Sequence, residues 1–246
     1  MSSEALLAVE GVSKRFGGLV ANQDVTLRLE RGEIRGLIGP NGAGKTTLIN
    51  LISGEESPSA GEVRLEGRSL LGIPPFQRAR RGLLRTFQVP RLFGTMTVRE
   101  NLLLPYLALG GRDRRAGRRR SDELLERSGL ARLAEEPARH LSGGQQALLQ
   151  LVAGFMCDGL RCYLLDEPFA GVNPLIKETM IDLIRDHNRR WSTVFLIVSH
   201  EMPVIRELCS RVTVLAAGRV LFEGTMEEVA RSREVVDAYL GREWTP

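Results

Sequence analysis

Hydrophobic and polar residues alternate near the amino terminus of the chain in the pattern of half-buried β-strands. Val25, Leu27 and Leu29 would face one side of such a strand, and the polar residues that alternate with them would face the other. Strand character returns at residues 62–65. The pattern therefore predicts a β-rich amino-terminal part.

A different pattern marks the buried strands of a core. Residues 33–38 predict a strand that leads directly into a glycine-rich turn, and the helix after it begins near Lys45 and stops at Gly54. Three apolar runs follow much later and have the character of buried parallel strands, separated by amphipathic helices. They span residues 163–166, 193–199 and 212–215. This alternation of strand and helix predicts a doubly wound α/β core.

The pattern changes to short helical segments between residues 76 and 140, where prolines and glycines interrupt it. We therefore predict one domain over residues 1–246 with a mainly helical insertion. The core would comprise about residues 1–88 and 158–246, and the helical subdomain about residues 89–157.

Composition fits an ordinary globular chain: 246 residues, 43% hydrophobic and 26% charged, with a net charge of +4. Much of the positive excess lies in one run, which contains Arg112, Arg114, Arg115, Arg118, Arg119 and Arg120. This run predicts a solvated face or a mobile loop, or alternatively attraction to anionic lipid headgroups or to an acidic loop of a partner. Nucleic acid is disfavoured because no aromatic residue interleaves with these arginines.

No signal peptide is evident, and no apolar run approaches the ~18 residues that would span a membrane. If the protein works at a membrane, other chains must do the spanning. The three cysteines, Cys157, Cys162 and Cys209, lack metal-ligand spacing. Cys157 and Cys209 lie in apolar stretches and are expected to be buried free thiols, which indicates a reducing cytosolic compartment.

Residues 39–46, Gly-Pro-Asn-Gly-Ala-Gly-Lys-Thr, match the phosphate-binding loop pattern between a predicted strand and a predicted helix. The glycines let successive backbone N–H groups converge on anionic oxygens, and the helix amino terminus adds the positive end of its dipole. Lys45 would face the β- and γ-phosphates, and the Thr46 hydroxyl would be a ligand for Mg²⁺.

Two carboxylates, Asp166 and Glu167, end an apolar strand. Asp166 could anchor Mg²⁺, and Glu167 could polarise an attacking water. By itself, such a pair often marks only the end of a strand. One helix earlier, residues 141–146 read Leu-Ser-Gly-Gly-Gln-Gln, in which Ser142 could cap a helix and the glycines leave N–H groups exposed.

Together and in this order, the three motifs resemble the ATPase subunits of ABC transporters over essentially the whole chain. By this resemblance Phe16 corresponds to the aromatic residue that stacks on adenine. Gln88 corresponds to the glutamine that reaches the Mg²⁺ site, and His200 to the switch histidine near the γ-phosphate. The alternatives are a core phenylalanine, a surface glutamine and a core histidine, respectively.

The resemblance implies a P-loop ABC-type ATPase fold with an antiparallel β amino-terminal part, and ATP and Mg²⁺ as cofactors. Implied catalytic residues are Glu167, His200 and Gln88, and the metal ligands are Thr46, Gln88 and Asp166. The implied nucleotide-binding residues are Phe16, Gly39, Pro40, Asn41, Gly42, Ala43, Gly44, Lys45, Thr46, Thr47, Ser142, Gly143, Gly144 and Gln145.

Expected partners are a second ATPase subunit, identical or paralogous, transmembrane permease subunits and an extracytoplasmic substrate-binding protein, with peripheral location on the cytoplasmic face of the membrane. Two such subunits would meet head to tail, so that Ser142 and Gly144 serve the partner's nucleotide.

Residues 170–174, 85–88 and 235–241 resemble the branch of ATPases that serves branched-chain amino acid importers. Urea importers and lipopolysaccharide exporters are close to this branch and stay open, as does a soluble ABC ATPase outside transport. The chain departs from the family's usual residues at 147–150, which read Ala-Leu-Leu-Gln, and at Asn173, where many relatives have aspartate.

Overall fold

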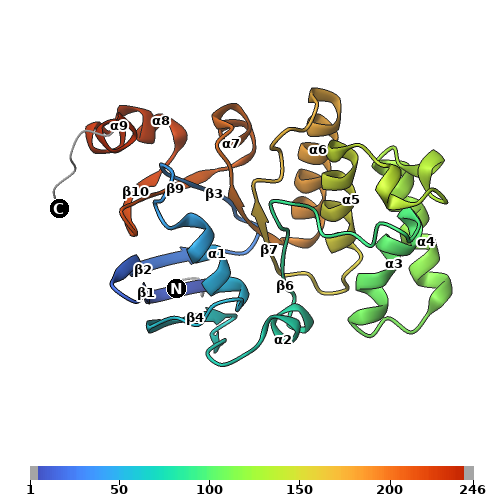
Figure 1. Cartoon of the computed structure of the whole chain (residues 1–246), viewed down its shortest axis with the longest axis horizontal. Helices are drawn as coiled ribbons and strands as arrows, with labels where there is room; N and C mark the ends of the chain where they lie inside the picture. Colours follow the sequence, from blue (N-terminus) through green and yellow to red (C-terminus); the bar gives the residue numbers. More distant parts are fainter. Residues whose placement is uncertain (1–4, 241–246) are drawn as a thin grey trace.

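The computed structural model describes residues 5–240, which form two β-sheets and a set of helices (Figure 1). The smaller sheet is antiparallel, in the order β2-β1-β4-β5. Its strands are β1 (Leu7–Phe16), β2 (Leu19–Leu29), β4 (Ala60–Leu65) and β5 (Arg68–Ser69). Along β2, Val25, Leu27 and Leu29 are buried and the alternating polar residues are exposed, as the pattern predicts.

The larger sheet forms the α/β core, in the order β10-β9-β3-β8-β7-β6. Its strands are β3 (Ile34–Ile38), β6 (Leu83–Arg85), β7 (Cys162–Asp166), β8 (Val194–Val198), β9 (Arg211–Ala216) and β10 (Arg219–Gly224). All neighbours are parallel except β10, which is antiparallel to β9.

Two core strands differ from expectation. β6 lies inside the segment expected to be helical, and β10 was not predicted. β6 has only three residues, too few for a periodic signal, and pairing with β7 places Leu83 opposite Cys162.

Helices cover both faces of the core sheet. α1 (Lys45–Ser53) lies in the apolar cluster between the two sheets, and Gly54 ends it in the left-handed conformation, as predicted. α5 (Gly143–Phe155), α6 (Pro174–Trp191) and α7 (Met202–Leu208) contribute to the cluster on the opposite face. The remaining core helices are α2 (Pro75–Arg80), α8 (Met226–Arg231) and α9 (Arg233–Leu240).

A helical part projects from the edge of the core on the right of Figure 1. It contains α3 (Val98–Ala108), α4 (Arg114–Arg127) and two short 3-10 helices, η1 (Ala131–Leu133) and η2 (Ala138–His140). α3 packs on α5, and residues of both belong to the same apolar cluster as the strands of the core. α5 therefore ties the helical part to the core.

The arginine run divides into two groups. α4 begins at Arg114, so most of the run is helical and not a mobile loop. Arg118 pairs with Asp122, and Arg120 pairs with Asp158 and donates to the Phe155 carbonyl at the end of α5. The other members, Arg112, Arg114, Arg115 and Arg119, are exposed.

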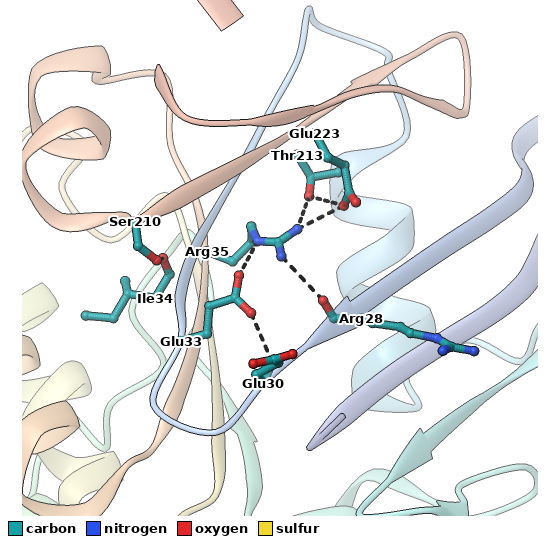
Figure 2. Close-up of polar contacts among 8 residues, drawn as sticks. All are labelled: Arg28, Glu30, Glu33, Ile34, Arg35, Ser210, Thr213 and Glu223. Carbon is teal, nitrogen blue, oxygen red and sulfur yellow. Dashed lines mark hydrogen bonds and ion pairs between the residues drawn. The ribbon is translucent and has the colours of Figure 1, made fainter. Parts of the chain in front are cut away.

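Buried Arg35 links the two sheets at the amino end of β3 (Figure 2). Its guanidinium donates to Glu33, to Glu223 at 2.9 Å and to Thr213 at 3.0 Å, and it reaches the Arg28 carbonyl of β2 at 3.4 Å. These contacts satisfy a buried cation that would otherwise destabilise the junction.

The three cysteines are buried and free, and burial raises each thiol pKa to about 12, so they are inert as nucleophiles. Across residues 5–240, every helix is too short or too polar to cross a bilayer. Gly241, the last residue of the carboxyl-terminal motif, lies outside the described residues.

Candidate active site

An open cavity of about 600 Å³ lies where β3, β7 and β8 end. Twelve of the predicted residues line it: Phe16, Asn41, Gly42, Ala43, Gly44, Lys45, Thr46, Thr47, Gln88, Asp166, Glu167 and His200. A larger cavity, of about 900 Å³, surrounds the Arg35 network at the other end of β3. We place the site in the smaller cavity because it gathers the phosphate loop, a lysine and two carboxylates, whereas the Arg35 donors are already occupied by protein acceptors.

The phosphate loop enters α1 without a side-chain cap. Gly44 is the N-cap residue, no side chain caps the helix, and its first turn holds no acidic residue. The first N–H groups of α1 and the positive end of its dipole are therefore available to an anion. Gly44 has a φ of +97°, and an added Cβ would lie 2.4 Å from the Ala21 carbonyl oxygen, so glycine is required there.

Asn22 stabilises this turn through a hydrogen bond to its backbone. Its Nδ2 donates to the Gly44 carbonyl at 3.3 Å, and its side chain is fully buried. No local pattern predicts this contact, because Asn22 lies in β2, 22 residues before Gly44.

Lys45 lies across the loop, where its ammonium donates to the Gly39 carbonyl at 2.7 Å and to the Pro40 carbonyl at 3.0 Å. Burial lowers its pKa, and the carboxylates of Glu167 and Asp166 counteract that shift. The site thus holds one buried cation near two carboxylates.

Glu167 has a φ of +48°, a conformation that costs a non-glycine residue energy and is concentrated at functional sites. Its amide donates to the Val198 carbonyl at 2.9 Å. Its carboxylate accepts the His200 backbone N–H at 3.2 Å and lies 3.3 Å from His200 Nε2. The structure therefore holds the Glu167 carboxylate against His200, two residues beyond the end of β8.

Burial raises the pKa of both carboxyl groups. For Asp166 the Arg85 and Lys45 cations oppose the shift. For Glu167 the His200 N–H and the His200 and Lys45 side chains oppose it, and Asp166 adds to it. A carboxylate with a raised pKa in a cleft is better suited to accept a proton than one in water.

Phe16 lies at the rim of the cavity with 45% of its surface exposed. The Lys14 ammonium is 4.8 Å from the ring centroid and is also paired with Glu56 at 2.8 Å. An exposed aromatic ring held in place at the rim offers a flat surface on which a planar base can stack.

Gln88 is exposed and lines the cavity near Thr46 and Asp166, at the start of the connection to the helical part. The preceding residue, Phe87, is held by hydrogen bonds to Gln150 of α5. Gln150 is one of the residues that depart from the family's usual pattern. Leu148 and Leu149, in the same stretch, are buried in the core. The departures therefore have packing and hydrogen-bonding roles of their own.

Six predicted residues do not line the cavity, although all lie within the described residues: Gly39, Pro40, Ser142, Gly143, Gly144 and Gln145. Gly39 and Pro40 instead hold the Lys45 ammonium. Ser142 caps α5 by accepting the Gln145 N–H at 3.3 Å, in a capping box that Gln145 completes. Residues 141–146, the signature segment of the chain, therefore do not line that chain's own cavity.

Asn173 caps α6 by accepting the Ile176 N–H at 3.0 Å. An aspartate would cap the helix in the same way, so this departure preserves the local structure.

The chain matches two family models and a set of known proteins. Residues 22–170 match the family model described as ABC transporter, and residues 219–245 match one described as branched-chain amino acid ATP-binding cassette transporter. A relative from Salmonella typhimurium, the high-affinity branched-chain amino acid transport ATP-binding protein LivG, is 40% identical, covering 97% of this chain and 99% of that protein.

Solved structures show the same fold. The ADP conformation of an ATP-binding cassette from an ABC transporter superposes with a TM-score of 0.85 at 29% identity, covering 97% of this chain and 99% of that one. A dimeric cassette in a post-hydrolysis state with ADP and phosphate gives 0.80 at 26% identity, covering 89% and 98%.

Proposed function

The chain belongs to the ABC transporter family as an ATP-binding and ATP-hydrolysing subunit, and we propose that it powers import of branched-chain or other hydrophobic amino acids. The observation that carries the substrate class is the match of residues 219–245 to the branched-chain cassette model, together with a full-length relative of that transport function. In this proposal the cavity binds the nucleotide, and other chains recognise the transported amino acid.

In this proposal Phe16 stacks on the adenine, and the phosphate loop and the open end of α1 bind the phosphates. Lys45 leaves the loop carbonyls to face the β- and γ-phosphates. Because an ammonium on a flexible stem can exchange backbone carbonyls for phosphate oxygens, binding needs no rearrangement of the fold.

The side chains at the cavity fit Mg²⁺. They offer a hydroxyl from Thr46, an amide from Gln88 and one carboxylate from Asp166, all hard oxygen donors. Among the described residues there is no cluster of three or more acidic, histidine or cysteine ligands. This agrees with an ion that completes its shell with water and phosphate oxygens, and when bound it would neutralise charge on those oxygens.

In this proposal Glu167 promotes the hydrolysis of ATP. Its carboxylate orients a water for attack on the γ-phosphorus, and the bond between that phosphorus and the ADP oxygen breaks as the new bond to water forms. His200 holds Glu167 through its backbone N–H and its ring. In this proposal the ring responds to the presence of the γ-phosphate. The αL backbone at Glu167 fixes the carboxylate before substrate arrives.

Two copies would complete each site. The Ser142 segment lies away from its own chain's cavity. In this proposal the amino end of α5, which begins at the Ser142 cap, meets the nucleotide of a second subunit. ATP would close the pair and hydrolysis would open it. The helical part, with boundaries near residues 89–157, would pass this motion to permease subunits at the cytoplasmic face of the membrane, with an extracytoplasmic binding protein supplying the cargo.

Reconstitution with the permease subunits and binding protein tests the proposal. We expect ATPase activity in proteoliposomes to rise when leucine-like amino acids are presented, and Gln88→Ala to reduce transport more than ATP affinity. A response to urea or to a lipid cargo in place of these amino acids would move the protein to a sister branch.

A further inference from the structure

Arg85 does not line the cavity, but it contacts two of the segments that form it. It is the last residue of β6, and only 10% of its side chain is exposed. Its Nη1 donates to Asn50 Oδ1 at 2.6 Å, and its Nη2 lies 3.4 Å from Asp166 Oδ2. One guanidinium thus joins α1, the helix that continues from the phosphate loop, to the carboxylate at the end of β7.

The same guanidinium reaches the segment that carries Gln88. Its central carbon is 4.5 Å from the centroid of the Phe87 ring, and the guanidinium carbon of Arg91 is 3.7 Å from that centroid. Phe87 directly precedes Gln88. Arg85 is therefore the side chain through which Asp166, α1 and the Gln88 segment meet.

Arginine suits this position because its planar fork offers five donors in a fixed arrangement, so holding one acceptor also fixes the direction of the others. Asp166 has a second cation nearby, Lys45, but that ammonium is bound to loop carbonyls and must move to the phosphates. Arg85 has no such second task. It can therefore keep an oriented cation beside Asp166 when Lys45 changes partners.

We propose that Arg85 is a positioning residue that fixes the Asp166 carboxylate for the metal–nucleotide complex and ties it to the segment bearing Gln88. This inference rests on the proposed nucleotide site but goes beyond it, because Arg85 itself does not line the cavity. Its loss should weaken the contribution of Mg²⁺ to ATP binding and leave metal-free binding in place.

The test measures ATP affinity with Mg²⁺ and with EDTA, in a Glu167→Gln background so that ATP is not consumed. We expect Arg85→Met to reduce the Mg²⁺-dependent gain in affinity about three- to tenfold, the range that one intramolecular hydrogen bond provides. Affinity in EDTA should stay within about twofold of the parent, because the phosphate loop is untouched.

Arg91→Met is the matched control, since it removes the other guanidinium stacked on Phe87 and its side chain has no contact with Asp166. It should leave both affinities unchanged. Arg85→Lys keeps the buried cation without the fork and should fall between the parent and Arg85→Met; if Arg85→Met does not fold, Arg85→Lys decides.

An unchanged Mg²⁺-dependent gain in the folded Arg85 variants, or an equal loss in Arg91→Met, would overturn the inference. If instead the parent gains no ATP affinity from Mg²⁺, the proposed function itself fails. The two failures are therefore distinguishable.

Discussion

Gln150 and Phe87 are joined by a pair of hydrogen bonds that links a side chain to both backbone groups of one residue. Nε2 of Gln150 donates to the Phe87 carbonyl at 2.9 Å, and the Phe87 N–H donates to Oε1 at 3.3 Å. The signature helix α5 is thereby attached to the segment that places Gln88 in the cavity. Motion of that segment must either carry α5 with it or break this pair.

Replacing Gln150 with Leu should uncouple the two elements. The change removes three hydrogen bonds, two with Phe87 and one that Gln150 Oε1 accepts from the Arg91 N–H at 3.1 Å. Each contributes about 0.5–1.5 kcal/mol, and Gln150 does not line the nucleotide cavity. We expect transport in proteoliposomes to fall several-fold while ATP affinity stays near that of the parent. Gln77→Leu, at an exposed glutamine of α2, is the control for a glutamine-to-leucine change away from this pair. Equal losses of transport and of ATP affinity would contradict the role of this pair.

Lys45→Ala removes the cation that we propose to face the phosphates, so ATP affinity and turnover should collapse. Hydrogen bonds to charged groups contribute about 1.5–3 kcal/mol, which corresponds to a loss of roughly ten- to over a hundredfold in affinity. Equilibrium ATP binding and phosphate release measure the two effects. Arg189→Ala, at an exposed cation on α6, is the control, and near-normal ATPase activity in Lys45→Ala would remove the lysine from the site.

Glu167→Gln keeps the shape of the side chain but removes the carboxylate. ATP should still bind, hydrolysis should stall, and the closed dimer should accumulate with ATP and Mg²⁺. Light scattering after size-exclusion chromatography and single-turnover hydrolysis report these outcomes. A variant that hydrolyses at the parental rate, or stays monomeric with ATP, is incompatible with Glu167 as the residue that orients the water.

Ser142→Arg tests whether the signature acts on the other subunit. We expect turnover to be blocked while the isolated monomer keeps its ATP affinity, because Ser142 does not line its own chain's cavity. Thr225→Arg is a matched control, since Thr225 also caps its helix, α8, through a capping box. Should monomer ATP binding fall as far as turnover does, Ser142 acts within its own chain.

The buried side chain of His187 makes the free energy of unfolding depend on pH. Its ring is buried and stacked 4.3 Å from Phe155, and burial, followed by the nearby Arg120 and Arg127, lowers its pKa from 6.5 to about 4. The unfolded chain therefore binds a proton more readily than the folded one. The contribution of His187 to the free energy of unfolding is fully present above pH 6.5. It is lost as the pH falls towards 4, by up to about 3 kcal/mol.

Urea unfolding at pH 7.5 and pH 5 measures this dependence. His187→Phe retains a ring for stacking and should unfold at more similar urea concentrations at the two pH values than the parent. Exposed His140→Gln should keep the parental dependence. A parental pH dependence in His187→Phe would assign the effect to other groups.

The amino-acid sequence by itself determined the parts of the site whose chemistry is local. The phosphate loop and the start of α1 are consecutive residues, and the direction of their N–H groups follows from glycine conformation and helix geometry. The same holds for the buried strands β3, β7, β8 and β9, because an apolar run bounded by turn residues carries its own signal.

Only the tertiary structure decided which distant residues meet. β6 is a strand because β7 offers it a partner, and its pairing brings Arg85 to Asp166 across 81 positions of sequence. Gln150 finds Phe87 across 63 positions, although its neighbours in sequence predict only a helix. Hydrogen bonds of this kind depend on register and burial, which no local pattern encodes. For the same reason, only the folded chain separates the Ser142 segment from the cavity.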